Sequence, residues 1–391
     1  MFLPDHLTGN GYFAIGEKRG LTIVQKEGLD FAKLDDFVAT KNEWKFGFLT
    51  YDIKNNIEAL NSNNSDELNF PLLYFFIPKT LLKYQQGKLE LIYGDKAHWK
   101  EANRFLKSKP KNLVCNVDFK SKLTKQEYLE RINSILKEIK LGNIYEANFC
   151  YEYFNKKAEI NPFDLYQHLT ALTNAPFASF GKFKDKYIIS ASPERFLKKE
   201  GNRLISEPIK GTTKRGKTHQ EDLHLKEALR TNEKERSENI MIVDLVRNDL
   251  SRIANFNSVK VEELCKIHTF DTVHQMISKI TCTINNNIRF SDIIKATYPM
   301  GSMTGAPKIS AMQIIEREEK TKRGLYSGSV GYITPENDFD FNVIIRTFLY
   351  NSSKKYLSAM VGGAITAKSN ANDEYKETLI KIEALLKALK K

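Results

Sequence analysis

Cysteine is scarce in this chain and is widely spread along it. The 391 residues include only four cysteines, at positions 115, 150, 265 and 282, and no two of them form a C-x-x-C pair. None lies in a G-x-C-x-G segment, which is typical of the nucleophile of a cysteine-based glutaminase. The sequence therefore supports neither a structural zinc site, nor a disulfide framework, nor a glutaminase activity in this chain.

Long apolar runs are also missing. The longest one covers residues 70–78 and is bounded by prolines, far short of the roughly 20 residues that a membrane-spanning helix needs. The first six residues lack the charged start and apolar stretch of a signal peptide. We therefore expect a soluble, cytoplasmic protein in a reducing compartment, with no membrane partner.

Positive charge is in excess, but it is not concentrated anywhere. The net charge is +12 and 28% of the residues are charged, yet no block of five or six lysines or arginines occurs. No nucleic-acid motif accompanies the charge, so we expect no nucleic-acid partner. An anion- or nucleic-acid-binding protein remains an alternative, and it predicts strongly salt-dependent retention on DNA or RNA.

The composition is that of a folded chain with a sizeable core. Hydrophobic residues make up 41% of it and aromatic residues 11%. The length allows two or three domains or one large unit. The first hundred residues alternate short aromatic, β-rich runs with polar turns, and a Lys-rich stretch at 107–111 indicates a connection. After it, Thr124-x-x-Glu127 forms a capping box that predicts the start of a helix.

Beyond this helix, strands and helices occur in blocks rather than in a regular βαβ rhythm. The patterns predict strands at residues 187–191, 273–283, 325–334, 339–349 and 356–365. They predict helices at residues 219–231, 234–250, 307–319 and 374–389. Because several strands are consecutive, we predict an α+β fold with large antiparallel sheets and helices on their outer faces.

The segment Pro208-Ile209-Lys210-Gly211-Thr212 is the most informative in the chain. A lysine held between a rigid entry and a glycine exit can be a nucleophile only if it loses its proton. A free lysine titrates near about 10.4, so only about one in a few thousand is neutral at neutral pH. Burial beside other positive charge can lower the pKa by roughly 3 to 5 units at the extreme. The alternative for an isolated Lys-Gly pair is a solvated turn.

Two Glu-x-x-Glu pairs have the spacing that puts both carboxylates on one face of a helix: Glu235 with Glu238, and Glu374 with Glu377. Facing each other across a cleft, they would form an oxygen-rich site for Mg²⁺. Glu316 and Glu319 have the same spacing and resemble a solvated helix face, which is the alternative for either pair. The apolar residues 240–243 favour a largely buried helix for Glu235 and Glu238.

Two glycine-rich loops and three polar residues in β-rich runs complete the candidates. The loop at 301–308 puts Pro307 at a plausible first helical position with free amides beside it, but its glycine spacing is not that of a Walker A loop. Gly362-Gly363-Ala364 would let the backbone approach a flat ligand. The three polar residues are Arg346, Tyr326 and His274. A buried arginine such as Arg346 needs an anionic partner. For His274, a hydrogen-bonded core position is an equal alternative.

Taken in order, these segments resemble the chorismate-utilising enzymes. This family contains anthranilate synthase component I, aminodeoxychorismate synthase component I, isochorismate synthase and salicylate synthase. The match covers residues 124–389, about two thirds of the chain. The segments that carry it are residues 190–196 (SASPERF), 208–212 (PIKGT), 235–249, 305–308 (GAPK) and 362–381.

The resemblance implies a fold and a domain organisation. Large antiparallel sheets would pack face to face around a central cleft, with helices on the outer faces. Residues 120–391 would form the chorismate-binding catalytic domain, and residues 1–110 a variable leading segment of the same unit.

The resemblance also implies a reaction. Anthranilate synthases have alanine at the position of Lys210, and a lysine there is similar to aminodeoxychorismate synthase component I. Lys210 would attack C2 of chorismate while the C4 hydroxyl leaves, with Glu194 as the general acid and later the base. Ammonia would then attack C4 and expel the lysine, giving 4-amino-4-deoxychorismate on the way to para-aminobenzoate and folate. The ammonia would come from a separate glutamine amidotransferase subunit.

The remaining site residues have roles that the resemblance also implies. Glu238 and Glu377 would bind Mg²⁺, and Glu235 and Glu374 would hold its waters. The nearby ion, Arg346 and Lys381 would help to keep Lys210 neutral. The residues expected to bind the substrate are Gly211, Thr212, His274, Tyr326, Arg346, Gly362, Gly363, Ala364 and Lys381.

The sequence departs from the family pattern at several places. Isochorismate and salicylate synthases have a lysine where this chain has Glu146, and ammonia-using members usually have glutamine. Ala364 replaces a more usual glycine. The N-terminal part has no Leu-Leu-Glu-Ser segment, so tryptophan feedback is not expected. Anthranilate synthase component I, which would release pyruvate, and a catalytically silent scaffold subunit are the alternatives.

Overall fold

The computed structural model describes residues 1–5, 9–25, 28–108, 117–270 and 273–390. Within these ranges it contains ten α-helices. They are α1 (Phe31–Val38), α2 (Lys54–Ile57), α3 (Lys96–Lys107), α4 (Lys125–Lys140), α5 (Pro162–Thr173), α6 (His219–Thr231), α7 (Glu233–Ser251), α8 (Phe290–Thr297), α9 (Lys308–Glu318) and α10 (Ala371–Ala388). Part of the predicted connection at 107–111, and Cys115, lie outside the described residues.

The described residues also contain nineteen strands, joined in one antiparallel sheet. The first nine are β1 (Phe2–Asp5), β2 (Asn10–Ile23), β3 (Lys45–Leu49), β4 (Leu73–Gln85), β5 (Lys88–Tyr93), β6 (Lys120–Ser121), β7 (Glu146–Asn155), β8 (Phe177–Phe183) and β9 (Lys186–Ser192). The others are β10 (Arg195–Glu200), β11 (Arg203–Glu207), β12 (Ile209–Lys214), β13 (Lys260–Thr269), β14 (Val273–Thr283), β15 (Gly305–Ala306), β16 (Ser329–Ile333), β17 (Phe339–Val343), β18 (Thr347–Asn351) and β19 (Tyr356–Thr366).

The pairing order shows how this sheet is built. Neighbouring strands run β13-β14-β11-β10-β17-β16-β3-β4-β2-β1-β8-β9-β18-β19-β7, with every pair antiparallel. The N-terminal strands β1 to β4 therefore lie in the middle and connect two halves that come from later parts of the chain. The leading segment is hydrogen-bonded into the same sheet as the rest, while the division near residues 110–120 stays a prediction.

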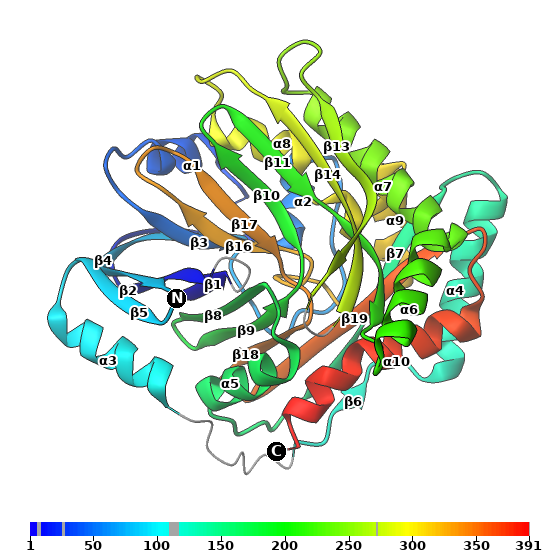
Figure 1. Ribbon diagram of the computed structural model, residues 1–391, viewed down its shortest axis with the longest axis horizontal. Helices are drawn as coiled ribbons and strands as arrows, with labels where there is room; N and C mark the ends of the chain where they lie inside the picture. The colour runs from blue at the N-terminus through cyan, green and yellow to red at the C-terminus, as the bar shows by residue number, and fades with distance from the viewer. Residues whose placement is uncertain (6–8, 26–27, 109–116, 271–272, 391) are drawn as a thin grey trace.

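Helices cover the outside of the sheet, as predicted (Figure 1). One hydrophobic cluster packs α1, α7 and α8 against strands such as β3, β4 and β17, and a second packs α4, α5 and α10 against β7, β9 and β19. The capping box is confirmed: the Glu127 N–H donates to Thr124 Oγ1 (3.2 Å), and the Thr124 N–H donates to Glu127 Oε2 (2.8 Å). The α+β fold with large antiparallel sheets and outer helices is therefore confirmed.

The predicted helices agree with α6, α7, α9 and α10 to within three residues at each end. Two strand predictions were too long. The segment 325–334 begins with a turn, and β16 starts only at Ser329. The segment 339–349 is split into β17 and β18, since Arg346 adopts a left-handed backbone with φ 53°. This break takes Arg346 out of the ladder.

Arg323 and Glu319 form a buried ion pair that also connects several elements of the fold. Arg323 is 2% exposed and donates to Glu319 Oε1 (2.7 Å), to the Met303 carbonyl (2.6 Å) and to the Asn148 carbonyl (2.6 Å). The expected solvated face at Glu316 and Glu319 was therefore wrong for Glu319, which is buried because it compensates this arginine. Breaking such a pair typically costs about 3–5 kcal/mol.

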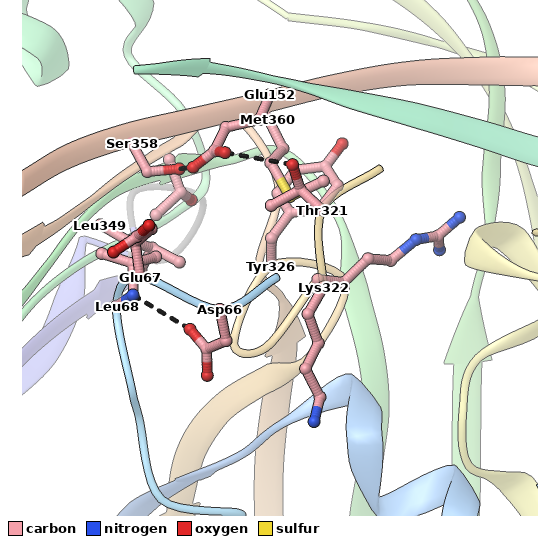
Figure 2. Close-up of a pocket in the computed structure, with 12 residues that line it drawn as sticks. Asp66, Glu67, Leu68, Glu152, Thr321, Lys322, Tyr326, Leu349, Ser358 and Met360 are labelled. Carbon is pink, nitrogen blue, oxygen red and sulfur yellow. Dashed lines mark hydrogen bonds between the residues drawn. The ribbon is translucent and has the colours of Figure 1, made fainter. Parts of the chain in front are cut away.

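A small polar cavity lies next to this pair (Figure 2). Its volume is about 10 Å³, enough for roughly one water molecule. Ser358 Oγ donates to Glu152 Oε1 (2.7 Å), and Thr321 Oγ1 donates to Glu152 Oε2 (3.2 Å). The cavity is too small for a substrate, so the Glu152 carboxylate is part of the internal hydrogen-bond network.

Candidate active site

A much larger cavity, of about 900 Å³, opens between the two halves of the sheet and the helices α7 and α10. This volume is typical of small-molecule sites. Of the fifteen predicted site residues, those lining it are Glu194, Lys210, Gly211, Thr212, Glu235, Glu238, Tyr326, Arg346, Gly362, Ala364, Glu377 and Lys381. Segments almost two hundred residues apart thus converge here.

Lys210 enters the cavity from β12. Its side chain is 11% exposed, and its Nζ lies 3.0 Å from Glu146 Oε1. Burial alone would lower the pKa of Lys210, but the carboxylates of Glu146, Glu238 and Glu194 outweigh it and hold that pKa above its usual value. The strongest neighbours are carboxylates rather than the predicted cations, so the expectation that Arg346 and Lys381 keep Lys210 neutral is wrong for the described groups.

Gly211 lets this lysine lie close to helix α7. Its φ is 82°, a left-handed conformation, and a Cβ there would come 3.1 Å from both Glu235 Oε2 and Leu229 Cδ1. A side chain would be strained by the backbone angle and crowded by the helix. The glycine after Lys210 therefore has a local steric reason.

Glu194 lies in the connection between β9 and β10 and is 6% exposed. Ser302 Oγ donates a hydrogen bond to Glu194 Oε1 (2.6 Å). Burial raises the pKa of Glu194 to about 7, although the Ser302 hydroxyl and the charge of Lys210 lower it in part. A carboxyl group with this pKa holds its proton through much of the neutral range and can act as an acid.

The four glutamates of the predicted metal site come from α7 and α10. Glu374 Oε1 lies 2.8 Å from Lys234 Nζ, and Glu377 Oε1 lies 2.7 Å from Lys381 Nζ. Burial raises the pKa of Glu238 to about 7, since it outweighs the charges of Lys210 and Lys234. Burial and the charge of Glu377 raise the pKa of Glu235. Lys234 and Lys381 therefore do not fully neutralise the four carboxylates of this cluster.

The donor chemistry of this cluster fits a divalent cation. Glu238 Oε1 is buried and accepts no hydrogen bond, with Lys234 Nζ still 3.8 Å away. Carboxylate oxygens are the ligands that Mg²⁺ prefers. Among the described residues, no three His, Cys, Asp or Glu side chains already form a group that could enclose a metal. Glu374 and Glu377 would have to exchange their ammonium partners for the ion.

Arg346 and Tyr326 lie together on the cavity wall. Arg346 Nη1 donates to the Lys381 carbonyl (3.0 Å). Burial lowers the pKa of Arg346, and the charges of Tyr326 and Glu377 offset this only in part. Among the described residues, no carboxylate forms an ion pair with this arginine, so the guanidinium is available to a ligand.

Three predicted residues do not line the cavity. His274 is fully buried, with Nε2 3.0 Å from Asp222 Oδ1 and Nδ1 3.0 Å from Thr269 Oγ1. This is the core histidine that the sequence left as an alternative. A Cβ on Gly363 would come 3.5 Å from Lys381 Nζ and 3.8 Å from Glu374 Oε2, and Glu374 is 3% exposed with its carboxylate next to Lys234.

The chain is similar to known proteins along most of its length. A family model described as chorismate binding enzyme matches residues 12–387. The chain belongs to the chorismate-binding enzyme family. It is therefore an enzyme that acts on chorismate. Residues from four of the five segments that carried the resemblance line the cavity, and none of residues 305–308 does. None of the described helices is long and apolar enough to cross a membrane.

Relatives of this chorismate-binding enzyme carry different names. It is 35% identical over 356 residues to the anthranilate synthase component I-like protein of Synechocystis, covering 88% of this chain and 72% of the relative. It is 35% identical over 293 residues to aminodeoxychorismate synthase component 1 of Escherichia coli, covering 75% of this chain and 64% of the relative. The crystal structure of anthranilate synthase component I from Streptococcus pneumoniae superposes with a TM-score of 0.81 at 25% identity, covering 95% and 91% of the two chains.

The sequence analysis missed two side chains of this chorismate-binding enzyme site, Ser302 and Lys234, and it named Glu146 only as a departure from the family pattern. Ser302 holds Glu194, Lys234 holds Glu374, and Glu146 holds Lys210. Glu146 and Asn148 stand two residues apart in β7, so an alternating polar pattern in an otherwise aromatic strand was the available signal for that wall. For Ser302 and Lys234 the sequence offered only their proximity to predicted motifs.

Proposed function

We propose that this enzyme makes 4-amino-4-deoxychorismate from chorismate and ammonia, with Lys210 as a covalent nucleophile. The observation that carries the proposal is a lysine amine in the chorismate cavity together with a buried acid, Glu194, whose pKa is raised to about 7. A site built for direct amination would not need a buried lysine at this point.

The residues act in two displacements. Lys210 Nζ attacks C2 while the C4 hydroxyl leaves with a proton from Glu194, which produces a covalent adduct. Ammonia then attacks C4 and expels the amine of Lys210. Two successive displacements retain the configuration at C4 and avoid a direct attack of ammonia on the hindered centre of chorismate itself.

The surrounding groups bind and orient the substrate. Arg346, which has no carboxylate partner in the part of the chain that the structure describes, would bind one substrate carboxylate in a bidentate manner. Lys381 and the amides near Gly362 would contact it from α10 and β19. We propose that Glu238 and Glu377 hold Mg²⁺, with Glu235 and Glu374 holding its waters. When bound, Mg²⁺ would neutralise the ring carboxylate and the glutamates around it.

Ammonia is proposed to come from a separate glutamine amidotransferase subunit. The relative in Escherichia coli is named component 1, and the sequence contains no glutaminase nucleophile segment. The product would feed the synthesis of para-aminobenzoate and folate. The names of other relatives keep anthranilate synthesis as the second candidate.

The product formed from chorismate and an ammonium salt tests this proposal. We expect 4-amino-4-deoxychorismate, identified by mass spectrometry, with no release of pyruvate. We also expect the chain alone to use ammonium salts and not glutamine. Anthranilate with one equivalent of pyruvate would contradict the proposal.

The acid role of Glu194 predicts a specific pH dependence. Its carboxyl group is protonated below a pKa of about 7, so kcat/KM for chorismate should fall about tenfold per pH unit above that value. In Glu194→Gln the rate should be about 100-fold or more lower, and this limb of the profile should disappear. A profile that is flat from neutral to alkaline pH in the parent enzyme would show that Glu194 is not the acid.

A further inference from the structure

Glu146 is fixed behind Lys210 by its backbone. It is the first residue of β7 and pairs with Ala306 of β15 on one side and with Thr366 of β19 on the other. Gly305 adopts φ 147°, and a Cβ on it would come 2.1 Å from the Glu146 carbonyl oxygen. This close approach holds Glu146 in place between two strands. The side chain is fully buried, and it does not line the cavity.

Among the described residues, Lys210 is the one hydrogen-bond partner of the Glu146 carboxylate. Its Oε1 lies 3.0 Å from Lys210 Nζ, while its Oε2 is buried and has no hydrogen-bond partner. In the part of the chain that the structure describes, this is also the one hydrogen bond that Lys210 Nζ makes. A buried carboxylate with one unpaired oxygen is costly as an anion. Transfer of one proton across the contact would remove both buried charges.

We infer that Glu146 accepts the proton that Lys210 must lose before it attacks chorismate, and returns it when the amine is released. The inference rests on the proposed function. It adds a catalytic residue at a position where ammonia-using members of the family usually have glutamine, a side chain that cannot accept a proton in this way.

The protons balance over the whole cycle. First, Lys210 Nζ gives a proton to Glu146 Oε1, which leaves a neutral amine and a carboxylic acid. The nitrogen lone pair then forms the bond to C2, both ring double bonds shift, and the C4–O bond breaks as Glu194 supplies the proton that makes the leaving group water. The adduct nitrogen is a secondary ammonium.

The second displacement restores every group. The lone pair of ammonia forms the C4–N bond, both ring double bonds shift back, and the C2–N pair returns to Lys210 as a neutral amine. The new C4 ammonium gives one proton to the Glu194 carboxylate. Glu146 returns its proton to Lys210. The net change is chorismate plus ammonia to 4-amino-4-deoxychorismate plus water.

The charges around Lys210 explain why a local acceptor is needed. Carboxylates from several elements interact electrostatically with it: Glu146 from β7, Glu194 from the β9–β10 connection, Glu235 and Glu238 from α7, and Glu377 from α10. Burial lowers the pKa of Lys210, but the charges of Glu146, Glu238 and Glu194 raise it by more, so bulk solvent does not remove the proton at neutral pH. In the described structure, Glu146 is the carboxylate in hydrogen-bond contact with the amine.

The test is the rate of adduct formation in Glu146→Gln. The full chain is mixed with chorismate and Mg²⁺ without ammonia, at a series of pH values between about 6 and 9. Each reaction is quenched at intervals, and the fraction of protein that carries the adduct is measured by mass spectrometry. At neutral pH the variant should form the adduct about 100-fold or more slowly than the parent. The deficit should shrink by about tenfold per pH unit as solvent begins to deprotonate the amine.

The opposite sign would overturn the inference. If the ion pair only kept Lys210 charged, the neutral amide would free the amine, and Glu146→Gln would form the adduct as fast as the parent or faster. Glu146→Asp keeps the acceptor but withdraws it by one methylene, so it should be slower than the parent and faster than Glu146→Gln. A Glu146→Asp rate equal to that of the parent would also count against the role, and this holds even if the glutamine variant does not fold.

Lys210→Ala separates this inference from the proposed function. If that variant still forms an adduct, the covalent role of Lys210 is wrong, and with it the reaction proposed above. If Lys210→Ala forms none while Glu146→Gln forms it at the parent rate, the reaction stands and only the role of Glu146 is wrong.

Discussion

Replacing Lys210 by alanine is expected to reduce the formation of 4-amino-4-deoxychorismate from chorismate and an ammonium salt by about 10³-fold or more. The variant lacks the amine that makes C4 accessible to ammonia, so it would have to react by direct attack at a hindered carbon. Its cavity keeps Arg346 and the glutamates, so chorismate should still bind. Product formation by liquid chromatography and chorismate binding by calorimetry measure the two effects separately.

A matched control is Lys260→Ala. Lys260 is the exposed first residue of β13 and lies outside the cavity, so its loss changes the net charge by the same amount without touching the site. We expect its rate to equal that of the parent. A Lys210→Ala enzyme that turns over as fast as this control would mean that the lysine is not the nucleophile.

Replacing Glu238 by alanine is expected to raise the Mg²⁺ concentration needed for half-maximal activity by about 100-fold or more. Loss of residues that merely support metal ligands already costs about 10- to 100-fold, and Glu238 is proposed to bind the ion directly. Among the described residues, no group donates a hydrogen bond to its buried Oε1, which leaves this oxygen free for the proposed ion. The shift in this Mg²⁺ concentration is measured by titrating the EDTA-treated enzyme with MgCl₂ and recording its activity at each concentration.

Glu233→Ala is the control for this prediction. Glu233 begins the same helix, α7, but its side chain is 89% exposed, and its partner Lys368 lies 3.7 Å away in solvent. Exposed pairs of this kind contribute little, so its Mg²⁺ titration should match that of the parent. Equal titrations for Glu238→Ala and Glu233→Ala would remove Glu238 from the proposed metal site.

The fold followed from local patterns where those patterns were strong. Helix α6 and strand β14 lie at the predicted residues because caps and turn residues mark their ends. The strand expected at 339–349 failed at Arg346, since periodicity does not reveal a left-handed residue inside a β-rich run. The role of β1 to β4 in joining the two halves of the sheet depends on pairings between distant segments, which no local pattern specifies.

The family motifs predicted most of the residues that line the site, but they did not predict the charges around Lys210. Lys210 and Glu194 line the cavity as expected, yet the contact between Lys210 and Glu146 joins residues 64 positions apart on strands that do not pair with each other. His274 was equally plausible as a ligand or as a core residue, and the structure gives both of its nitrogens internal partners. Which charges surround an amine depends on the folded arrangement, and this decides its protonation.

The most direct test of the account is a search for a bond between the enzyme and its substrate. The chain should be incubated with chorismate and Mg²⁺ without ammonia, digested, and analysed by peptide mass spectrometry. The account predicts added mass, equal to chorismate less one water, on the peptide that contains Lys210, and its disappearance when an ammonium salt is supplied. An unmodified Lys210 peptide from an enzyme that makes product with ammonium salts would contradict it.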